Sequence, residues 1–583
     1  MQLIGFLNNK NLIFNAKLFG NGFRSVIKDK EFNLYCDSTD SKEKLLYHSR
    51  KDIHLALFGY VASESHYSTG DLRDTLDAII ENYLVNGIKS FNSLDGSYIV
   101  ILWDAHKNII YIGRDIYGTK LLYFYFSPRS GFAFSNNLDI LLRATGQRNI
   151  SHKALHEYLR FLDISPPYTI YENTYFLEPD KILISDGRQI TQQKISSQTI
   201  NEIQRDGLLE DKAHNFKNIL YQSIKKRIEK AQRVGVFLSG GIDSTLVCAI
   251  AARIKKDIKA YTVGFGDPRY DESKIARNIT SYLGIEHQVF KFTIEEDYNV
   301  FNEFVTRISS PFADPAVIPT FQCFKHIANS VDIVLDGTGA DSLIGIMPAR
   351  HIRFILQYAR YIPYKIRLFI SNQLNKFHSI SSYSSLFDFK KVVELLIRWQ
   401  GWSEEEMSLL CNVRCDLSYT RFYRLFAEHS HKEPYELYSI LIGALADDRQ
   451  LQTAPLYDID IAFPFWDRKV QEYVKNLPLK YKYHNGTSKI LFRKLLEELI
   501  PTNIWDKPKH PFDYPFKNLL IYNDCKLPKL FLSRDIVKEQ GFFDPLIVEK
   551  YLQKFLDGDD SIKFKIWALV VFQAWYFNHY QTY

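Results

Sequence analysis

The sequence has few cysteines and no long apolar run. Among its 583 residues are six cysteines, and only Cys411 and Cys415 lie close together, without a second Cys or His pair at the spacing of a zinc site. Such scattered thiols are typical of a reducing cytoplasm, where we expect the protein to reside. No stretch approaches the ~18 apolar residues of a membrane span, and the N-terminus lacks the charged and apolar regions of a signal peptide.

The chain also has no strong excess of charge of one sign. Its 73 basic and 67 acidic residues give a net charge of +6, which is too mild for a nucleic-acid-binding protein. One basic stretch, from Arg350 to Lys376, places Arg and Lys among Tyr, Phe and Ile. It is either a solvated helix face or a surface for an acidic partner. We expect neither a nucleic acid nor a membrane as a partner.

A change of pattern along the chain predicts two domains. Residues 1–195 contain short alternating strands such as 97–103 and 109–112, with helical spacing at 72–83, which indicates an α+β sandwich. Residues 190–212 are polar and are predicted to be a linker. Residues 208–583 begin with an amphipathic helix over 211–230 and continue with apolar strands at 234–238, 258–263 and 331–335, which favours an α/β domain. Beyond about residue 345 the chain is predicted to be helical and is rich in aromatic residues.

One loop stands out for its chemistry. Residues 239–244 read Ser-Gly-Gly-Ile-Asp-Ser, between an apolar strand and a predicted helix at 245–254. Two glycines allow a sharp turn and close approach to a ligand, and the unpaired amides of a helix start bind anions. Asp243 would repel phosphate unless it held Mg²⁺. A plain strand-to-helix turn is the alternative, and the loop is not a Walker loop because it lacks Gly-Lys-Ser/Thr.

This string resembles the PP-loop of the ATP pyrophosphatases, and the chain from about residue 57 to 515 resembles the asparagine synthetase family. That family includes β-lactam synthetases and lasso-peptide macrolactam synthetases. The other segments that carry the resemblance are Tyr270-Asp271-Glu272-Ser273, Leu283-Gly284 to His287, Pro311-Phe312-Ala313-Asp314-Pro315, Asp336-Gly337-Thr338-Gly339-Ala340-Asp341, Asp460 to Asp467, and Lys507-Pro508-Lys509-His510-Pro511-Phe512.

The resemblance implies an α+β Ntn-glutaminase-like sandwich over 1–195. It implies a Rossmann-like α/β PP-loop ATP pyrophosphatase domain with a helical C-terminal part over 208–583. It also implies ATP and Mg²⁺ as cofactors, with a substrate carboxylate that attacks the α-phosphate. Asp243 and Asp341 would hold Mg²⁺, and Lys509 would stabilise the developing negative charge. The residues implied to bind ATP are Leu238, Ser239, Gly240, Gly241, Ile242, Asp243, Ser244, Val263, Asp336 and Gly337.

Two departures from the family concern the amine. Glutamine-using members begin with a catalytic Cys after Met removal, whereas residue 2 here is Gln, and Phe58-Gly59-Tyr60-Val61 replaces the glutamine-binding Asn-Gly-Glu stretch. We therefore expect a glutaminase-like domain that does not hydrolyse glutamine. Thr338 occupies the place of a Glu or Tyr and is no strong base. Asp460 is the candidate general base or its orienter; alternatively, it is a structural carboxylate paired with Arg449 or Arg468.

These features favour an AMP-forming ligase whose amine belongs to the substrate, as in lasso-type macrolactam formation on a peptide or small-molecule carboxylate. The lasso analogy would also imply a leader peptidase and a leader-binding protein as partners. The alternatives are amidation of aspartate or a sugar acid with free ammonia, β-lactam closure, an inactive scaffold, and a tRNA-modifying enzyme. The absence of a Tyr at position 338 counts against β-lactam closure. The retained loop counts against a scaffold, and the absence of Cys pairs counts against tRNA modification.

Overall fold

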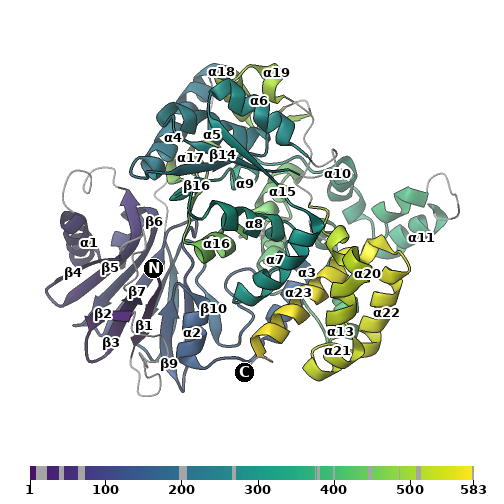
Figure 1. Ribbon diagram of the computed structural model, residues 1–583, viewed down its shortest axis with the longest axis horizontal. Coiled ribbons are helices and arrows are strands. Elements are labelled where there is room, and N and C mark those ends of the chain that lie inside the picture. Colours follow the sequence, from purple (N-terminus) through teal and green to yellow (C-terminus); the bar gives the residue numbers. More distant parts are fainter. Residues whose placement is uncertain are drawn as a thin grey trace.

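The fold was obtained as a computed structural model. It describes residues 1–7, 23–37, 45–62, 72–195, 207–264, 271–374, 376, 381–397, 401–443, 449–484, 486–506 and 514–580. Figure 1 shows a β-rich part at one side of the molecule, an α/β part above it and a helical part that ends in α23. Among the described residues, no helix is both long and apolar enough to span a bilayer.

The N-terminal part is a sandwich of two six-stranded antiparallel sheets, ordered β10-β8-β9-β1-β3-β2 and β12-β11-β7-β6-β5-β4. The alternating patterns of its strands put one face of each sheet into a shared core that contains Phe32, Trp103 and Phe134. Helix α1 covers the outer face of the second sheet, and α2 covers that of the first. The predicted α+β sandwich is therefore confirmed.

The strands are β1 Leu3–Leu7, β2 Phe23–Lys28, β3 Phe32–Asp37, β4 Leu45–Arg50, β5 Ile53–Ala62, β6 Asp95–Asp104, β7 Ile109–Arg114, β8 Tyr123–Ser127, β9 Gly131–Ser135, β10 Thr174–Phe176, β11 Lys181–Ser185 and β12 Ile190–Lys194. The helices of this part are α1 Leu72–Asn86, α2 Leu138–Thr145 and α3 His152–Phe161. The prediction of a linker from residue 190 is wrong for β12, whose polar residues pair with β11 at the edge of the sheet. The limits 1–195 and 208–583 stay predictions.

The second part is a five-stranded parallel sheet, ordered β15-β14-β13-β16-β17, with helices on both faces. Its strands are β13 Val234–Phe237, β14 Lys259–Gly264, β15 Glu286–Lys291, β16 Ile333–Leu335 and β17 Asp460–Ala462. The helices around it are α4 Leu209–Ile228, α5 Ile242–Ile254, α6 Ser273–Leu283, α8 Val317–Ile327, α17 Arg468–Lys475, α18 Ile490–Leu499 and α19 Thr502–Trp505. This is the predicted α/β PP-loop fold, in which ligands bind where the strands end.

The remaining helices form the C-terminal part and the connections to it. They are α7 Ile294–Arg307, α9 Ala340–Ile344, α10 Arg350–Gln357, α11 Tyr364–Leu374, α12 Val392–Leu395, α13 Glu404–Leu410, α14 Arg421–His429, α15 Pro434–Ile442, α16 Arg449–Thr453, α20 Lys517–Phe531, α21 Arg534–Gln540, α22 Pro545–Leu556 and α23 Lys563–Tyr580.

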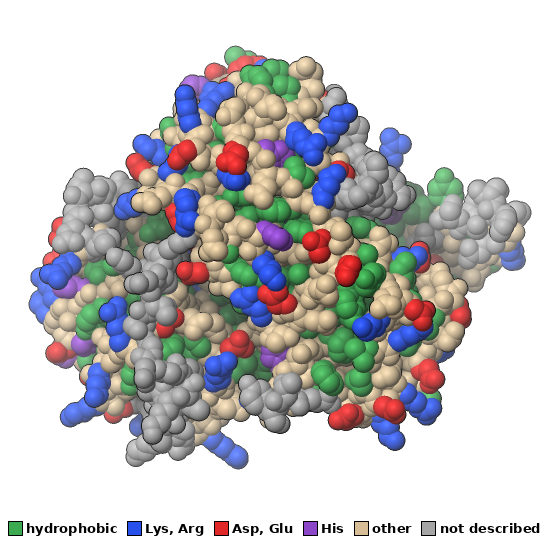
Figure 2. Space-filling view, viewed as in Figure 1, with side chains coloured by type: hydrophobic (Ala, Val, Ile, Leu, Met, Phe, Trp, Pro, Cys, Tyr) green, Lys and Arg blue, Asp and Glu red, His purple; other side chains and the backbone are tan. Residues whose placement is uncertain are grey.

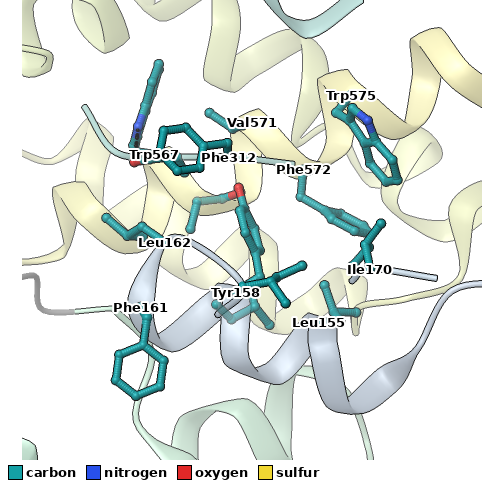
Figure 3. Close-up of a cluster of buried hydrophobic side chains, with 14 of the residues drawn as sticks. Leu155, Tyr158, Phe161, Leu162, Ile170, Phe312, Trp567, Val571, Phe572 and Trp575 are labelled. Carbon is teal, nitrogen blue, oxygen red and sulfur yellow. Dashed lines mark hydrogen bonds between the residues drawn. The ribbon is translucent and has the colours of Figure 1, made fainter. Parts of the chain in front are cut away.

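The apolar helix α23, near the C-terminus, packs against helix α3 of the N-terminal part. Figure 3 shows Tyr158 and Leu155 of α3 facing Val571 and Phe572 of α23. The buried Tyr158 hydroxyl donates to the Ala568 carbonyl at 2.8 Å, so the aromatic ring is packed and its polar end is satisfied. The sandwich and the C-terminal helices therefore share one hydrophobic core.

Candidate active site

The glycine-hinged loop follows the central strand β13 and starts helix α5. Gly240 has φ +83°, and a Cβ there would lie 3.1 Å from Cγ2 of Ile275, so a side chain would be both strained and crowded. Ser239 and Ser244 lie on either side of the turn, with their hydroxyl oxygens 3.0 Å apart. Gly241 is the N-cap of α5, whose first amides are thus left for an anion.

A second glycine loop, residues 336–341, follows the neighbouring strand β16. The Asp336 carboxylate fixes its turn, because it accepts from the Thr338 amide at 2.7 Å and from the Gln450 side chain at 3.1 Å. A Cβ on Gly337 would lie 3.0 Å from the backbone nitrogen of Ser244. The two loops therefore touch through their backbones, and only glycine at 337 allows this approach.

Lys489 joins the two loops electrostatically. Its ammonium forms ion pairs with Asp243 of the first loop and, at 2.5 Å, with Asp341 of the second. The residue is only 5% exposed. Burial alone would lower its pKa, but the two carboxylates outweigh burial and hold the pKa of Lys489 above its ordinary value. Asp243 and Asp341, which are predicted to hold a metal ion, thus lie on either side of the Lys489 ammonium.

Lys489 was missed in the sequence, although it leaves two signals. It is the N-cap of α18, where a positive charge opposes the helix dipole, and its backbone is left-handed at φ 61°. A lysine that follows Gly486-Thr487-Ser488 and starts a helix is therefore electrostatically unfavourable unless acidic groups face it. The backbone strain is retained because the side chain reaches Asp243 and Asp341.

The residues predicted to meet adenine lie at the carboxyl ends of β13 and β14. The Leu238 amide donates to the Tyr261 carbonyl at 2.9 Å, and its carbonyl accepts from the Thr262 hydroxyl at 2.5 Å. Thr262 also contacts His287 at 2.9 Å. Val263 is half-buried in β14. The backbone of Leu238 thus already bonds within the protein, while the carbonyl keeps one lone pair for a ligand.

Asp460 lies elsewhere. It is the first residue of β17 and stands level with Ile333, at the amino end of β16, whereas the glycine loop follows the carboxyl end. Its carboxylate pairs at 3.0 Å with Lys120 of the sandwich. The predicted structural partners are wrong, because Arg449 pairs with Asp314 and Arg468 pairs with Glu472. This placement favours an interdomain ion pair, and the role of general base stays a prediction.

Thr338 and Lys509 are the other two residues predicted to act in catalysis. Thr338 lies beside Gly337 in the second loop and is half-buried. Lys509 belongs to residues 507–513, which lie outside the described part of the chain.

The sandwich offers no reachable thiol among its described residues. Cys36 is the only cysteine before Cys248, and it is fully buried in β3. The Tyr60 hydroxyl is also buried, near the charges of Arg227 and Lys226, and burial raises its pKa. A thiol in this position is out of reach of a substrate amide.

Among the described residues, no group of three or more His, Cys, Asp or Glu is arranged to hold a metal ion. Two carboxylates are nevertheless enough for Mg²⁺ when phosphate oxygens complete the coordination. Asp243 and Asp341, which already share one cation, fit this requirement.

A parallel sheet with a glycine-hinged anion site at its central strand defines an ATP-using enzyme of the PP-loop type. The family model described as Asparagine synthase matches residues 215–576, and the one described as Glutamine amidotransferase domain matches residues 62–196. The chain therefore belongs to the asparagine synthase family, whose members form amides at the expense of ATP.

Similar proteins agree with this membership. Asparagine synthetase [glutamine-hydrolyzing] 1 of Bacillus subtilis is 26% identical over 83% of this chain and 78% of its own length. The asparagine synthetase of Gallus gallus is 22% identical over 86% of this chain and 76% of its own. The structure of an NH3-dependent NAD synthetase from Campylobacter jejuni matches with a TM-score of 0.18 and 15% identity, over 32% of this chain and 82% of that one.

Proposed function

We propose that the protein activates a substrate carboxylate with ATP and joins it to an amine that does not come from glutamine. The observation that carries the proposal is the meeting of Asp243, Asp341 and Lys489 beside the glycine-hinged start of α5. The carboxylate oxygen attacks the α-phosphorus, which forms an acyl-adenylate and releases pyrophosphate. The amine then attacks the acyl carbon, forms the amide and releases AMP.

Each group has a distinct task in this scheme. The amides at the start of α5 and the hydroxyls of Ser239 and Ser244 receive the pyrophosphate oxygens. Asp243 and Asp341 would hold Mg²⁺, whose charge offsets that of the phosphates. The buried ammonium of Lys489 stabilises negative charge that develops on the α-phosphate, and it needs no reorganisation because the carboxylates hold it in place. Lys509 remains a second candidate for that task.

The source of the amine separates two forms of the proposal. An amine of the substrate itself, which closes a macrolactam, is favoured because Cys36, the one cysteine before Cys248, is buried and Thr338 provides no strong base. Free ammonia is the second candidate, since the relatives are asparagine synthetases and the buried Cys36 cannot release ammonia from glutamine.

The test is exchange of labelled pyrophosphate into ATP with a panel of carboxylates, followed by mass spectrometry of the products. We expect carboxylate-dependent exchange and AMP, no stimulation by glutamine, and no exchange in D341N. The control D557N changes an exposed carboxylate at the end of α22 and should behave as the wild type. A product lighter by one water indicates ring closure, and a primary amide formed only with ammonia indicates the second form. Release of ADP, or exchange that survives in D341N, would overturn the proposal.

A further inference from the structure

Helices α10 and α11 form an arm that the proposed function does not use. The arm comprises residues 349–374, with the 3-10 turn Ala359–Tyr361 between the two helices. Figure 1 shows α11 projecting from one side of the molecule along its longest axis. The turn Ser381–Leu386 packs against α11, and four residues of α11 (Lys365, Ile366, Phe369 and Asn372) are exposed.

Helix α11 is inverted relative to an ordinary surface helix. Its buried positions are polar, with Arg367 at 5% and Ser371 at 1% exposure, whereas Ile366 is 52% and Phe369 is 62% exposed. An amphipathic helix of a free-standing protein has the opposite arrangement. The apolar stripe of α11 therefore lacks cover among the described residues.

The inversion is fixed by the hydrogen bonds of Arg367. Its Nε donates to the Ile362 carbonyl at 2.9 Å and its Nη1 to the Phe389 carbonyl at 2.7 Å. The guanidinium also lies 3.6 Å from the centre of the Phe389 ring. Rotation of α11 to bury Phe369 would break these bonds and leave a charged group in the interior without partners. The outward position of Ile366 and Phe369 is thus the stable one.

Three further aromatic residues are exposed on α10 and on the 3-10 turn that follows it. Tyr358 is 62% and Tyr361 is 69% exposed, and Phe354 is 37% exposed. Together with Ile366 and Phe369 they give this short arm five exposed large apolar side chains. So many within one projecting segment indicate an interaction surface rather than chance exposure of single residues.

The charge of the arm has one sign. None of the residues from 342 to 387 is Asp or Glu, whereas six of them are Lys or Arg. Two of them, Arg350 of α10 and Lys365 of α11, are exposed. Over the rest of the face drawn in Figure 2, basic and acidic side chains are interspersed. The surface therefore fits a partner that is negatively charged over a wide area.

We propose that the arm lies on the surface of an anionic phospholipid bilayer. Aromatic rings and Ile366 would enter the headgroup region while Arg350 and Lys365 meet the phosphates, which is how basic helices with aromatic residues bind such surfaces. A projecting arm suits a flat sheet of lipid, whereas an acidic peptide would need a groove or a strand edge to be enclosed. A second copy of the arm would repel the first, because both are basic.

The lack of a long apolar run excludes a membrane span but not a helix that lies along the surface, so the expected absence of a membrane partner does not extend to the arm. None of the residues of the arm belongs to the nucleotide site, so its contact with lipid is independent of the ligase substrate.

The test is flotation of the full chain with vesicles of phosphatidylcholine alone or with about a third phosphatidylglycerol. We expect binding to the anionic vesicles only, and release when salt is raised to about 0.5 M, because such contacts are screened. I366S/F369S and R350E/K365E should each weaken binding about tenfold or more. The control L84S/V85S alters two apolar residues of α1, which are 45% and 81% exposed, and should bind as the wild type.

All variants should keep the thermal midpoint of the wild type, because the changed side chains are exposed. Equal binding to both kinds of vesicle, no binding, or unchanged binding of I366S/F369S would overturn the proposal. A poly-glutamate peptide serves as the competing probe. If it bound through the arm while vesicles did not, the surface would belong to an acidic polypeptide and the lipid proposal would be wrong.

Discussion

Replacement of Lys489 by Met tests the centre of the site, because Met keeps most of the volume and removes only the charge. In the wild type Lys489 is 5% exposed and its ammonium contacts two partly exposed carboxylates, so its removal leaves two neighbouring like charges without their cation. Loss of one partner of a fully buried pair costs about 3–5 kcal/mol. Because Asp243 and Asp341 keep some contact with water, we expect K489M to lose less free energy of unfolding than that, about 1–3 kcal/mol, in urea titrations without nucleotide.

The same variant should fail in catalysis for a separate reason. Removal of one preorganised group that stabilises transition-state charge typically lowers kcat about 10²–10³-fold. We therefore expect a loss of that size in pyrophosphate exchange, with ATP still bound. Mg²⁺ should stabilise K489M more than the wild type, because the ammonium no longer competes for Asp243 and Asp341.

The matched control for K489M lies on the same helix. Lys494 pairs with Glu210 at 2.9 Å, and both groups are solvent-accessible, so K494M should leave the stability and kcat close to those of the wild type. If K489M were as stable as K494M and retained its activity within about tenfold, Lys489 would have neither the electrostatic nor the catalytic role inferred from its position.

Three further outcomes are expected. G337A should lower the ATP affinity measured by calorimetry, because its Cβ would lie 3.0 Å from the Ser244 nitrogen. The control G113A should bind ATP as the wild type does, because its Cβ would meet only side chains at 3.4 Å and beyond. Burial raises the pKa of Glu157 to about 8, so ionisation destabilises the folded state as pH rises from about 4.5 to 8. Relative to the wild type, E157Q should gain up to about 4 kcal/mol of unfolding free energy at pH 9 and nothing at pH 4. An equal gain at both pH values would refute this. D460N and K120M should show coupling in a double-mutant cycle of stability, and additive effects would contradict the ion pair.

The strands with continuous apolar residues could be predicted, and the edge strands could not. The stretch 234–238 contains β13, whose first three residues are buried because helices cover both faces. Strand β15, Glu286–Lys291, lies at the edge of the sheet and has only two apolar residues, Val289 and Phe290, and β17 has only three residues in all. Neither has a pattern that distinguishes it from a loop.

In the site, too, the residues within local motifs could be predicted, and the contacts between distant residues could not. Asp243 lies in a glycine-rich string whose spacing carries its chemistry, and Asp341 closes a second such string. Lys489 stands 246 residues from Asp243, and Lys120 stands 340 residues from Asp460. No periodicity relates residues so far apart, so these pairs become evident only when the fold brings their elements together.

The contacts of the sandwich explain how a domain without a reachable thiol can serve the site. Lys120 holds Asp460 at the start of β17, which pairs with β16 just before the second glycine loop. Lys226 of α4 pairs with Asp95 at 3.1 Å and with Asp467 at 2.5 Å, and Asp467 in turn caps α17. Each of these ion pairs reaches an element that forms or covers the nucleotide sheet. Because the position of the second loop depends on β16 and β17, support of these strands from the sandwich would preserve the approach of Asp341 to Asp243, and that task needs no nucleophile.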